Sequence, residues 1–201
     1  MFTKTQEKII GFLMANPEAK SSIRSIARNM KKSYTLVYNN IVNLEKKGII
    51  SKESVPPAHI ITISEFAPEN IIVNAELKRK EELLETHAWI KVMMKDIVNS
   101  SRNIFFVLMI FGSYAKKSQK KDSDIDILAV VQDKRYISKI EDAIRNAYTK
   151  ARKSINVVTV EDFTEMIRNT EEFNIGNEAR KYHILLQGAE MYYQLSRGAK
   201  D

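Results

Sequence analysis

Three segments in the first 46 residues place apolar side chains at the spacing of amphipathic helices. The first, 5–14, ends at the Asn16–Pro17 break, the second follows the N-cap candidates Ser21 and Ser22, and the third follows Ser33. We therefore predict three consecutive helices. Their inward-facing positions are Ile9, Ile10, Leu13 and Met14, then Ile23, Ile26, Ala27 and Met30, then Val37, Ile41 and Leu44.

Two short apolar runs follow the third predicted helix. That helix ends at Lys46-Lys47-Gly48, the basic residues and glycine that a helix C-terminus prefers. The runs, 49–50 and 60–63, predict two strands around a polar tip, 51–59, that contains Pro56-Pro57.

The order of three helices and a hairpin is that of a winged helix. The stretch Leu44-Glu45-Lys46-Lys47-Gly48-Ile49-Ile50 strongly resembles the end of the recognition helix and the first wing strand in winged helix-turn-helix domains. The resemblance covers about residues 3–64 and implies a double-stranded DNA-binding domain over 1–64, with a protein–protein module as the alternative.

Net charge is concentrated in the same third of the chain. Residues 1–64 carry ten basic and four acidic side chains, so this segment holds +6 of the net +7. Lysines would contact phosphates, and the outer face of the third helix would approach base edges. The predicted DNA-contacting residues are Lys31, Lys32, Lys46, Lys47 and Lys52 for phosphates, and Thr35, Leu36, Tyr38, Asn39 and Asn43 for bases.

Residues 65–86 are predicted to be a helical connector, with helical composition over 69–80 and again over 81–99. An apolar stripe in the second segment would pack onto the next domain or across a homodimer, with Trp89 as an anchor. The stripe consists of Leu83, Leu84, Trp89, Ile90, Met93, Ile97 and Val98.

The second half of the chain alternates strand and helix patterns. A continuous apolar run, 104–111, predicts a buried strand that ends abruptly at Gly112-Ser113. A second strand follows Asp124, and a third covers 155–160. Further helices are predicted over 135–152, 161–168 and 171–181. These elements predict an α+β fold, in which a winged helix-turn-helix precedes an α/β domain with a small mixed sheet over 87–201.

The segment between the first two of these strands carries the candidate chemistry. Asp124 and Asp126 would point to one face of a strand, because side chains i and i+2 lie on the same side. Two adjacent carboxylates repel each other unless a cation lies between them, and Mg²⁺ binds such oxygens together with substrate phosphates. Gly112 would allow close backbone approach, and Ser113 would add a hydroxyl donor. The segment predicts a phosphate-binding turn beside a metal-binding carboxylate pair.

Gly112-Ser113, ten further residues and Asp124-Ile125-Asp126 resemble the polymerase-beta-like nucleotidyltransferases, especially the minimal nucleotidyltransferases, over about residues 87–195. The resemblance implies transfer of a nucleoside monophosphate from a nucleoside triphosphate to a hydroxyl, with pyrophosphate leaving. Asp124 and Asp126 would be catalytic and hold Mg²⁺, and Gly112 and Ser113 would bind the nucleotide. Lys116 and Lys117 would assist at the phosphates.

One departure from the family concerns the third carboxylate, which usually lies on the next strand. The expected position holds Asn156. An amide oxygen can ligate a metal but cannot accept a proton at neutral pH. Glu161 and Asp162 follow nearby and are expected to begin and cap the next helix, and His183 is expected to be a packing or surface residue. Nucleotide and metal binding are therefore better supported than turnover.

Two other functions stay open. The chain would be a DNA-binding transcriptional regulator whose second domain only senses nucleotide, or an antitoxin-type transferase that modifies or sequesters a partner protein. Cysteine is absent, which excludes disulfides, thiolate zinc sites and cysteine nucleophiles. No apolar run approaches the roughly 18 residues of a membrane span, and the start has no apolar signal core. We expect a cytoplasmic protein without a membrane partner.

Overall fold

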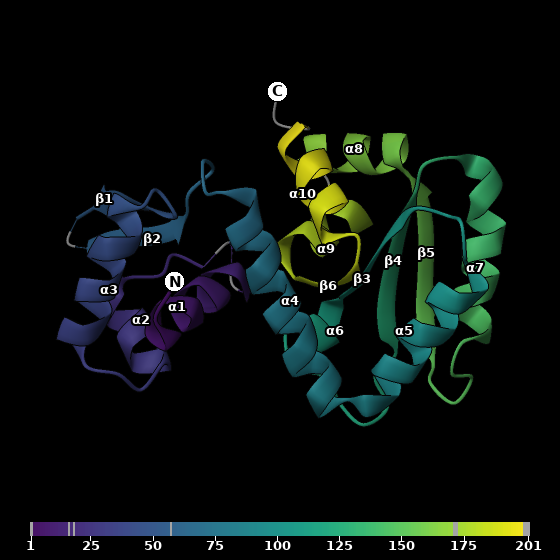
Figure 1. The fold of residues 1–201 in the computed structure, drawn as a ribbon, viewed down its shortest axis with the longest axis horizontal. Helices are drawn as coiled ribbons and strands as arrows, with labels where there is room; N and C mark the ends of the chain where they lie inside the picture. The colour runs from purple at the N-terminus through teal and green to yellow at the C-terminus, as the bar shows by residue number, and fades with distance from the viewer. Residues whose placement is uncertain (1, 16, 18, 57, 171–172, 199–201) are drawn as a thin grey trace. The chain divides into compact units, whose positions relative to one another are not determined.

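A computed structural model of the protein describes residues 2–15, 17, 19–56, 58–170 and 173–198 (Figure 1). The chain divides into two compact units, Met1–Ala75 and Glu76–Asp201. The boundary lies inside helix α4 (Glu69–Thr86), so the range predicted as a connector, 65–86, contributes to both units.

The N-terminal unit has the predicted order of three helices and a hairpin. Ser22 and Ser33 cap α2 and α3 as predicted, because their side chains accept the N–H groups of Ser25 and Leu36. The predicted inward-facing side chains are buried except Met30, which lies at the C-cap of α2. The elements are α1 (Lys4–Ala15), α2 (Ile23–Asn29), α3 (Tyr34–Lys46), β1 (Ile50–Val55) and β2 (Ala58–Ile63).

The hairpin is longer than its apolar residues predict. The strands pair from Ile50↔Ile63 to Val55↔Ala58, so most of the predicted polar tip is strand. In β1 only Ile50 is buried, and cross-strand hydrogen bonds hold the exposed ribbon together, which apolar patterning does not reveal. Asn16 and Pro57, both part of the predicted turns, lie outside the described residues.

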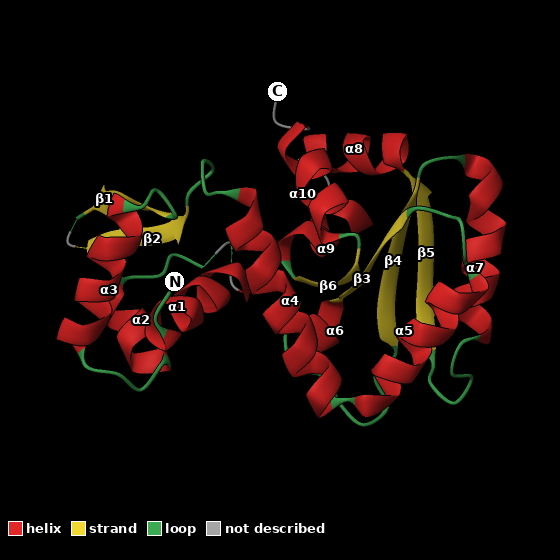
Figure 2. Ribbon diagram, in the orientation of Figure 1, coloured by secondary structure: helices red, strands yellow, loops and turns green. Residues whose placement is uncertain are grey.

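The second unit contains the predicted small mixed sheet, in the order β5-β4-β3-β6 (Figure 2). β3 is antiparallel to both β4 and β6, whereas β4 and β5 are parallel. α5 (Ala88–Ser100) and α7 (Ile137–Asn146) pack on one face, and α8 (Val160–Arg168), α9 (Ile175–Lys181) and α10 (Ala189–Gly198) pack on the other. The strands are β3 (Phe106–Phe111), β4 (Ile125–Val131), β5 (Lys153–Thr159) and β6 (His183–Gln187), and α6 (Gly112–Ala115) follows β3.

Three predicted helix boundaries are wrong. The helix predicted over 135–152 ends at Asn146, where the backbone of Ala147 becomes extended, and the Lys153 ammonium from β5 donates to the Ile144 and Arg145 carbonyls at 2.9 Å. The break predicted at 80–81 lies at His87, between α4 and α5. The helix predicted over 171–181 begins at Ile175, and residues 171–172 lie outside the described residues.

Trp89 is a packing anchor, as predicted. Its ring stacks on Tyr148 at a centroid distance of 5.4 Å and meets the Tyr114 ring edge-on at 6.0 Å. It packs against the buried cluster between the sheet and α5. Across the described part of the chain, no helix is both long enough and apolar enough to cross a membrane.

Candidate functional site

The Gly-Ser turn and the second aspartate meet where β3 ends and β4 begins. The antiparallel register pairs Phe111 with Asp126, and Gly112 follows directly with φ +64°. A Cβ at Gly112 would overlap Oδ2 of Asp126 and lie 3.0 Å from its Cγ. Both the left-handed backbone and the adjacent carboxyl therefore require glycine at this position. Sequence motifs twelve residues apart are in direct contact here.

Ser113 and Asp124 lie on either side of this contact. Ser113 is half-buried in the first turn of α6, and its carbonyl accepts the Ser118 N–H at 2.9 Å, which closes the loop. Asp124 lies just before β4, and its Oδ1 is 3.0 Å from Nε of Arg152. The structure thus brings together the four residues predicted to bind nucleotide and metal.

The Asp126 carboxyl is partly buried and has several charged side chains nearby. Burial raises the pKa of its carboxyl, the neighbouring Glu178 and Asp124 carboxylates raise it further, and the Lys116 ammonium lowers it. The pKa of Asp126 is therefore raised above its ordinary value, as expected for a partly buried carboxyl with other carboxylates nearby. A bound cation would relieve this repulsion.

Glu178 is a neighbour that sequence reasoning missed. It lies on α9, and its Oε1 is 3.5 Å from Nζ of Lys116. The same ammonium lies 4.9 Å from the centroid of the Tyr182 ring. Lys117 behaves differently, because its Nζ lies 3.6 Å from Glu82 on the exposed surface of α4. Of the two lysines predicted to assist, the structure brings only Lys116 to the aspartates.

The residue beside Asp126 on β5 is Ser154. The parallel register pairs Asp126 with Ser154 and Leu128 with Asn156. Asn156 therefore shares the face of Asp126 but lies two residues farther along the strand, and neither side chain is a carboxylate. Asp162 caps α8 with Thr159 as predicted, and those hydrogen bonds lower its pKa.

Mg²⁺ fits the donor chemistry of this site. The Asp124 and Asp126 carboxylates lie near enough to interact electrostatically, and the side chain of Asp124 is half exposed, which leaves room for substrate oxygens. Within the described residues, no group of three His, Cys, Asp or Glu side chains is arranged to hold a metal. The protein would therefore supply two carboxylates, the number that Mg²⁺ commonly takes beside phosphates.

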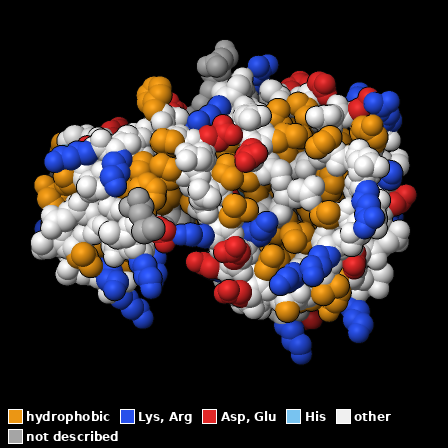
Figure 3. Space-filling model, viewed as in Figure 1, with side chains coloured by type: hydrophobic (Ala, Val, Ile, Leu, Met, Phe, Trp, Pro, Cys, Tyr) orange, Lys and Arg blue, Asp and Glu red, His pale blue; other side chains and the backbone are white. Residues whose placement is uncertain are grey.

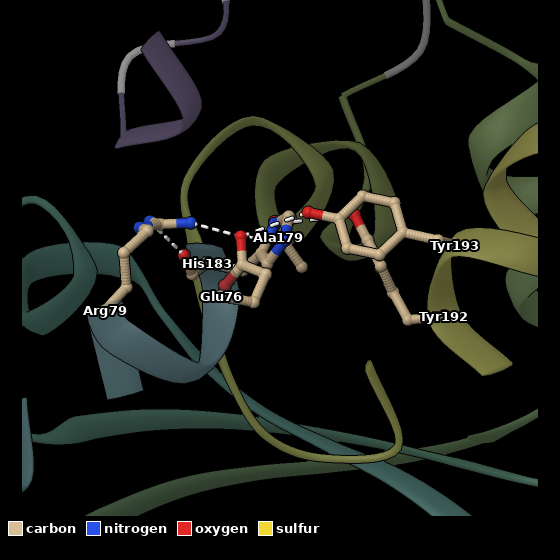
Figure 4. Close-up of polar contacts among 6 residues, drawn as sticks. All are labelled: Glu76, Arg79, Ala179, His183, Tyr192 and Tyr193. Atoms are coloured by element: carbon tan, nitrogen blue, oxygen red, sulfur yellow. Dashed lines mark hydrogen bonds and ion pairs between the residues drawn. The ribbon is translucent and has the colours of Figure 1, made fainter. Parts of the chain in front are cut away.

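His183 is buried beside Glu76, as a packing residue (Figure 4). Its Nδ1 donates to the Ala179 carbonyl at 2.8 Å, and its own carbonyl accepts from Arg79 at 2.6 Å. Glu76, also buried, pairs with Arg79 at 2.5 Å and accepts from the Tyr193 hydroxyl at 3.0 Å. Burial lowers the pKa of His183, so its ring is neutral near pH 7.

The predicted DNA-contacting residues all lie on the surface of the N-terminal unit. Tyr38 stacks on Tyr34 at 6.1 Å, and both rings are more than two-fifths exposed. Asn43 is partly committed elsewhere, because its Oδ1 accepts from Gln6 of α1 at 2.9 Å. Figure 3 shows Lys and Arg side chains spread over the visible face of this unit.

A family comparison agrees with the motif analysis of the second unit. No curated protein matches the chain. One similar solved structure is a MepR mutant from a multidrug resistant S. aureus clinical isolate, with 19% identity, a TM-score of 0.36 and coverage of 49% of this chain and 78% of that one. Another is a toxin–antitoxin with AMP-PNP, with 14% identity, a TM-score of 0.37 and coverage of 54% and 82%. Residues 92–175, which include the Gly-Ser turn and both aspartates, match the family described as polymerase beta, nucleotidyltransferase.

Proposed function

We propose that the second unit is a Mg²⁺-dependent nucleotidyltransferase domain that transfers a nucleoside monophosphate from a nucleoside triphosphate to a hydroxyl. The observation that carries the proposal is the contact between Gly112 and the Asp126 carboxyl, which joins the Gly112-Ser113 turn to a carboxylate pair. In the reaction, the hydroxyl oxygen loses its proton to solvent and forms a bond to the α-phosphorus. The bond from that phosphorus to the α–β bridging oxygen breaks, and pyrophosphate leaves with the electron pair.

Each residue of the proposed site has a separate role. Asp124 and Asp126 would hold Mg²⁺, which supplies neutralisation of charge on the phosphate oxygens and on the leaving group. Gly112 leaves room for the Asp126 carboxyl against the backbone of the turn, and the Ser113 hydroxyl can donate to a phosphate oxygen. The raised pKa of Asp126 is consistent with a position that a cation would stabilise.

The experiment is a label-transfer assay with the full chain. Triphosphates labelled at the α-phosphate are incubated with Mg²⁺ and a cell extract that supplies acceptors, and both labelled products and pyrophosphate are measured. We expect transfer that disappears when Asp124 and Asp126 are both replaced by Ala. Absence of both transfer and triphosphate binding in the wild-type chain would contradict the proposal.

A nucleotide sensor is the second candidate, and one observation favours it. The β5 position beside Asp126 holds Ser154, so this strand supplies no carboxylate to accept the proton of an attacking hydroxyl. A domain of this kind binds Mg²⁺ and triphosphate but turns over slowly. Tight triphosphate binding without label transfer, in the assay above, would identify the sensor.

We also propose that the N-terminal unit binds duplex DNA through α3. The exposed Thr35, Leu36, Tyr38 and Asn39 lie on the helix surface away from the buried Val37, and exposed lysines flank them. Phosphate contacts by lysines release counterions, so affinity should fall steeply as salt rises. Titration of the full chain against duplex DNA at several salt concentrations tests this, and no binding at low salt would contradict it.

A further inference from the structure

Each aspartate of the proposed site is accompanied by a basic side chain from another part of the second unit. Arg152 lies against Asp124, and Lys116 lies near Asp126. Neither pairing is part of the Gly-Ser or Asp-x-Asp motif. Both basic side chains lie where a metal ion and an anionic substrate would meet.

Arg152 is placed by the parallel pairing of β4 and β5. Its carbonyl accepts the Ile125 N–H at 3.0 Å, which holds its backbone beside the start of β4. Its Nε lies 3.0 Å from Oδ1 of Asp124, and its guanidinium also donates to the Asp122 carbonyl. The side chain is 70% exposed, so the guanidinium is anchored at its base and open to solvent at its tip.

Lys116 is held by a contact that is easily exchanged. Its ammonium lies 3.5 Å from Glu178 and over the Tyr182 ring, and both charged side chains are more than one-third exposed. Exposed ion pairs of this kind contribute little to stability, because water competes for both partners. The ammonium is therefore able to leave Glu178 for a stronger anion within reach of its flexible stem.

Binding of a divalent cation changes what these two side chains can do. A metal ion bound by Asp124 and Asp126 neutralises the negative charge of their carboxylates and repels a neighbouring ammonium or guanidinium. The triphosphate that accompanies the metal brings a cluster of anionic oxygens, for which Arg and Lys form strong charge-assisted hydrogen bonds.

Building on the proposed function, we propose that Lys116 and Arg152 are exchangeable cations. They neutralise the acidic cluster in the ligand-free protein and bind triphosphate oxygens once a metal ion occupies the aspartates. The metal ion releases Lys116 and Arg152 from the acidic cluster, and the triphosphate binds the released side chains. Metal and triphosphate therefore bind cooperatively. Removal of either side chain should tighten metal binding alone and weaken triphosphate binding.

The experiment measures these two affinities separately in the full chain. Mn²⁺ alone, an oxygen-preferring substitute for Mg²⁺ that is visible by electron paramagnetic resonance, reports on the aspartates. Inorganic tripolyphosphate, titrated calorimetrically at saturating Mn²⁺, reports on phosphate contacts without a base. For Lys116→Ala and Arg152→Ala, we expect Mn²⁺ affinity to rise about threefold and tripolyphosphate affinity to fall about tenfold.

Two matched variants are the controls. Lys117→Asn removes the adjacent lysine, which pairs with Glu82 and has φ 55°, and Arg145→Ala removes an exposed arginine that pairs with Glu141. Both should leave the two affinities unchanged. Lys116→Arg should restore most of the tripolyphosphate affinity, because it keeps the positive charge.

The outcomes separate the two proposals. If the wild-type chain binds neither Mn²⁺ nor tripolyphosphate, the proposed function fails and the exchange fails with it. If it binds both but the two alanine variants shift both affinities in the same direction, or not at all, the exchange alone is overturned. Glu178→Gln should leave tripolyphosphate affinity equal or higher. A loss as large as that of Lys116→Ala would make Glu178 a required positioning residue instead.

Discussion

The two units hold their candidate functional side chains in opposite environments. On α3, Leu36 and Tyr38 are exposed on a helix surface, and replacing them disturbs little packing. At the proposed nucleotide site, the Asp126 carboxyl lies partly buried against Gly112, with Glu178 nearby. Binding through the exposed face of α3 would depend on the chemistry of individual side chains. Binding at the strand end would depend on the space available to the single carboxyl of Asp126. Substitutions should therefore have graded effects in the first unit and nearly all-or-none effects in the second.

The largest effect is expected from Asp124→Ala combined with Asp126→Ala. Mg²⁺-dependent triphosphate binding, measured by calorimetry, should fall below detection, and circular dichroism should show an intact fold because mutual carboxylate repulsion is removed. The control variant Asp142→Ala, which lacks an exposed carboxylate on α7, should bind triphosphate with the affinity of the wild-type chain. Unchanged triphosphate affinity in the double variant would reject the proposed site.

Gly112→Ala tests the role of clearance directly. The added methyl group overlaps the Asp126 carboxyl, and we expect triphosphate affinity to fall about a hundredfold, as misplacement of a positioned group does. Gly48→Ala is the matched control in the other unit, because φ is +68° and no atom lies within 4 Å of the added Cβ. It should cost about 1 kcal/mol of stability and leave nucleotide binding intact. Equal triphosphate affinity for the two variants would contradict the expected contact.

A carboxylate introduced on β5 should sharpen the distinction between transferase and sensor. Ser154→Asp places it beside Asp126, whereas Asn156→Asp places it beside Leu128. General-base assistance is typically worth about 10²–10⁴-fold, and we expect the lower end for Ser154→Asp and a smaller gain for Asn156→Asp. Label transfer per minute is the measurement. A larger gain from Asn156→Asp would show that the register does not decide the position of the base.

Graded effects are expected for DNA. Lys31→Asn with Lys32→Ala should weaken all duplexes about tenfold at low salt and flatten the salt dependence, because phosphate contacts are lost. Asparagine is chosen since Lys31 has φ 51°. Tyr38→Ala with Asn39→Ala should instead erode sequence preference more than total affinity. Identical salt slopes for wild type and the lysine variant, in anisotropy titrations, would remove these lysines from the interface.

The smallest effect concerns stability. Because burial and neighbouring carboxylates raise the pKa of Asp126, its charged form is less favourable in the folded than in the unfolded chain. Asp126→Asn should therefore raise Tm at neutral pH. The corresponding gain in the free energy of unfolding should be less than about 1 kcal/mol. The gain should fade as pH falls through the pKa of Asp126, where the wild-type carboxyl becomes neutral. A variant less stable than wild type at pH 7 would mean that the carboxylate makes a stabilising contact.

Local signals made much of this fold predictable. The Ser22 and Ser33 caps act over three residues, and the run 104–111 contains a strand buried on both faces. The Gly-Ser and Asp-x-Asp segments are recognisable by their own residue types, which is why a turn beside a carboxylate pair is predictable from the chain alone, although the contact between Gly112 and the Asp126 carboxyl is not.

Long-range features were not predictable in the same way. Glu178 and Arg152 carry no motif, and they reach the aspartates only through the packing of α9 and the pairing of β5. The last carbonyls of α7 accept hydrogen bonds from an ammonium of the following strand. Strand register decides whether Ser154 or Asn156 lies beside Asp126, and a shift of two residues leaves the same face inward, so apolar patterning cannot distinguish them.

The buried cluster around Glu76 has a consequence for where the second unit can be cut from the chain. Arg79 of α4 donates to the carbonyl of His183, whose strand position pairs with Phe111 immediately before Gly112. A fragment that begins at residue 87 would lose Glu76 and Arg79 and leave the His183 carbonyl and the Tyr193 hydroxyl without their partners. The smallest autonomous form of the second unit therefore has to carry α4 from Glu76 onward, and trimming at residue 87 would loosen the strand beside the Gly112-Ser113 turn.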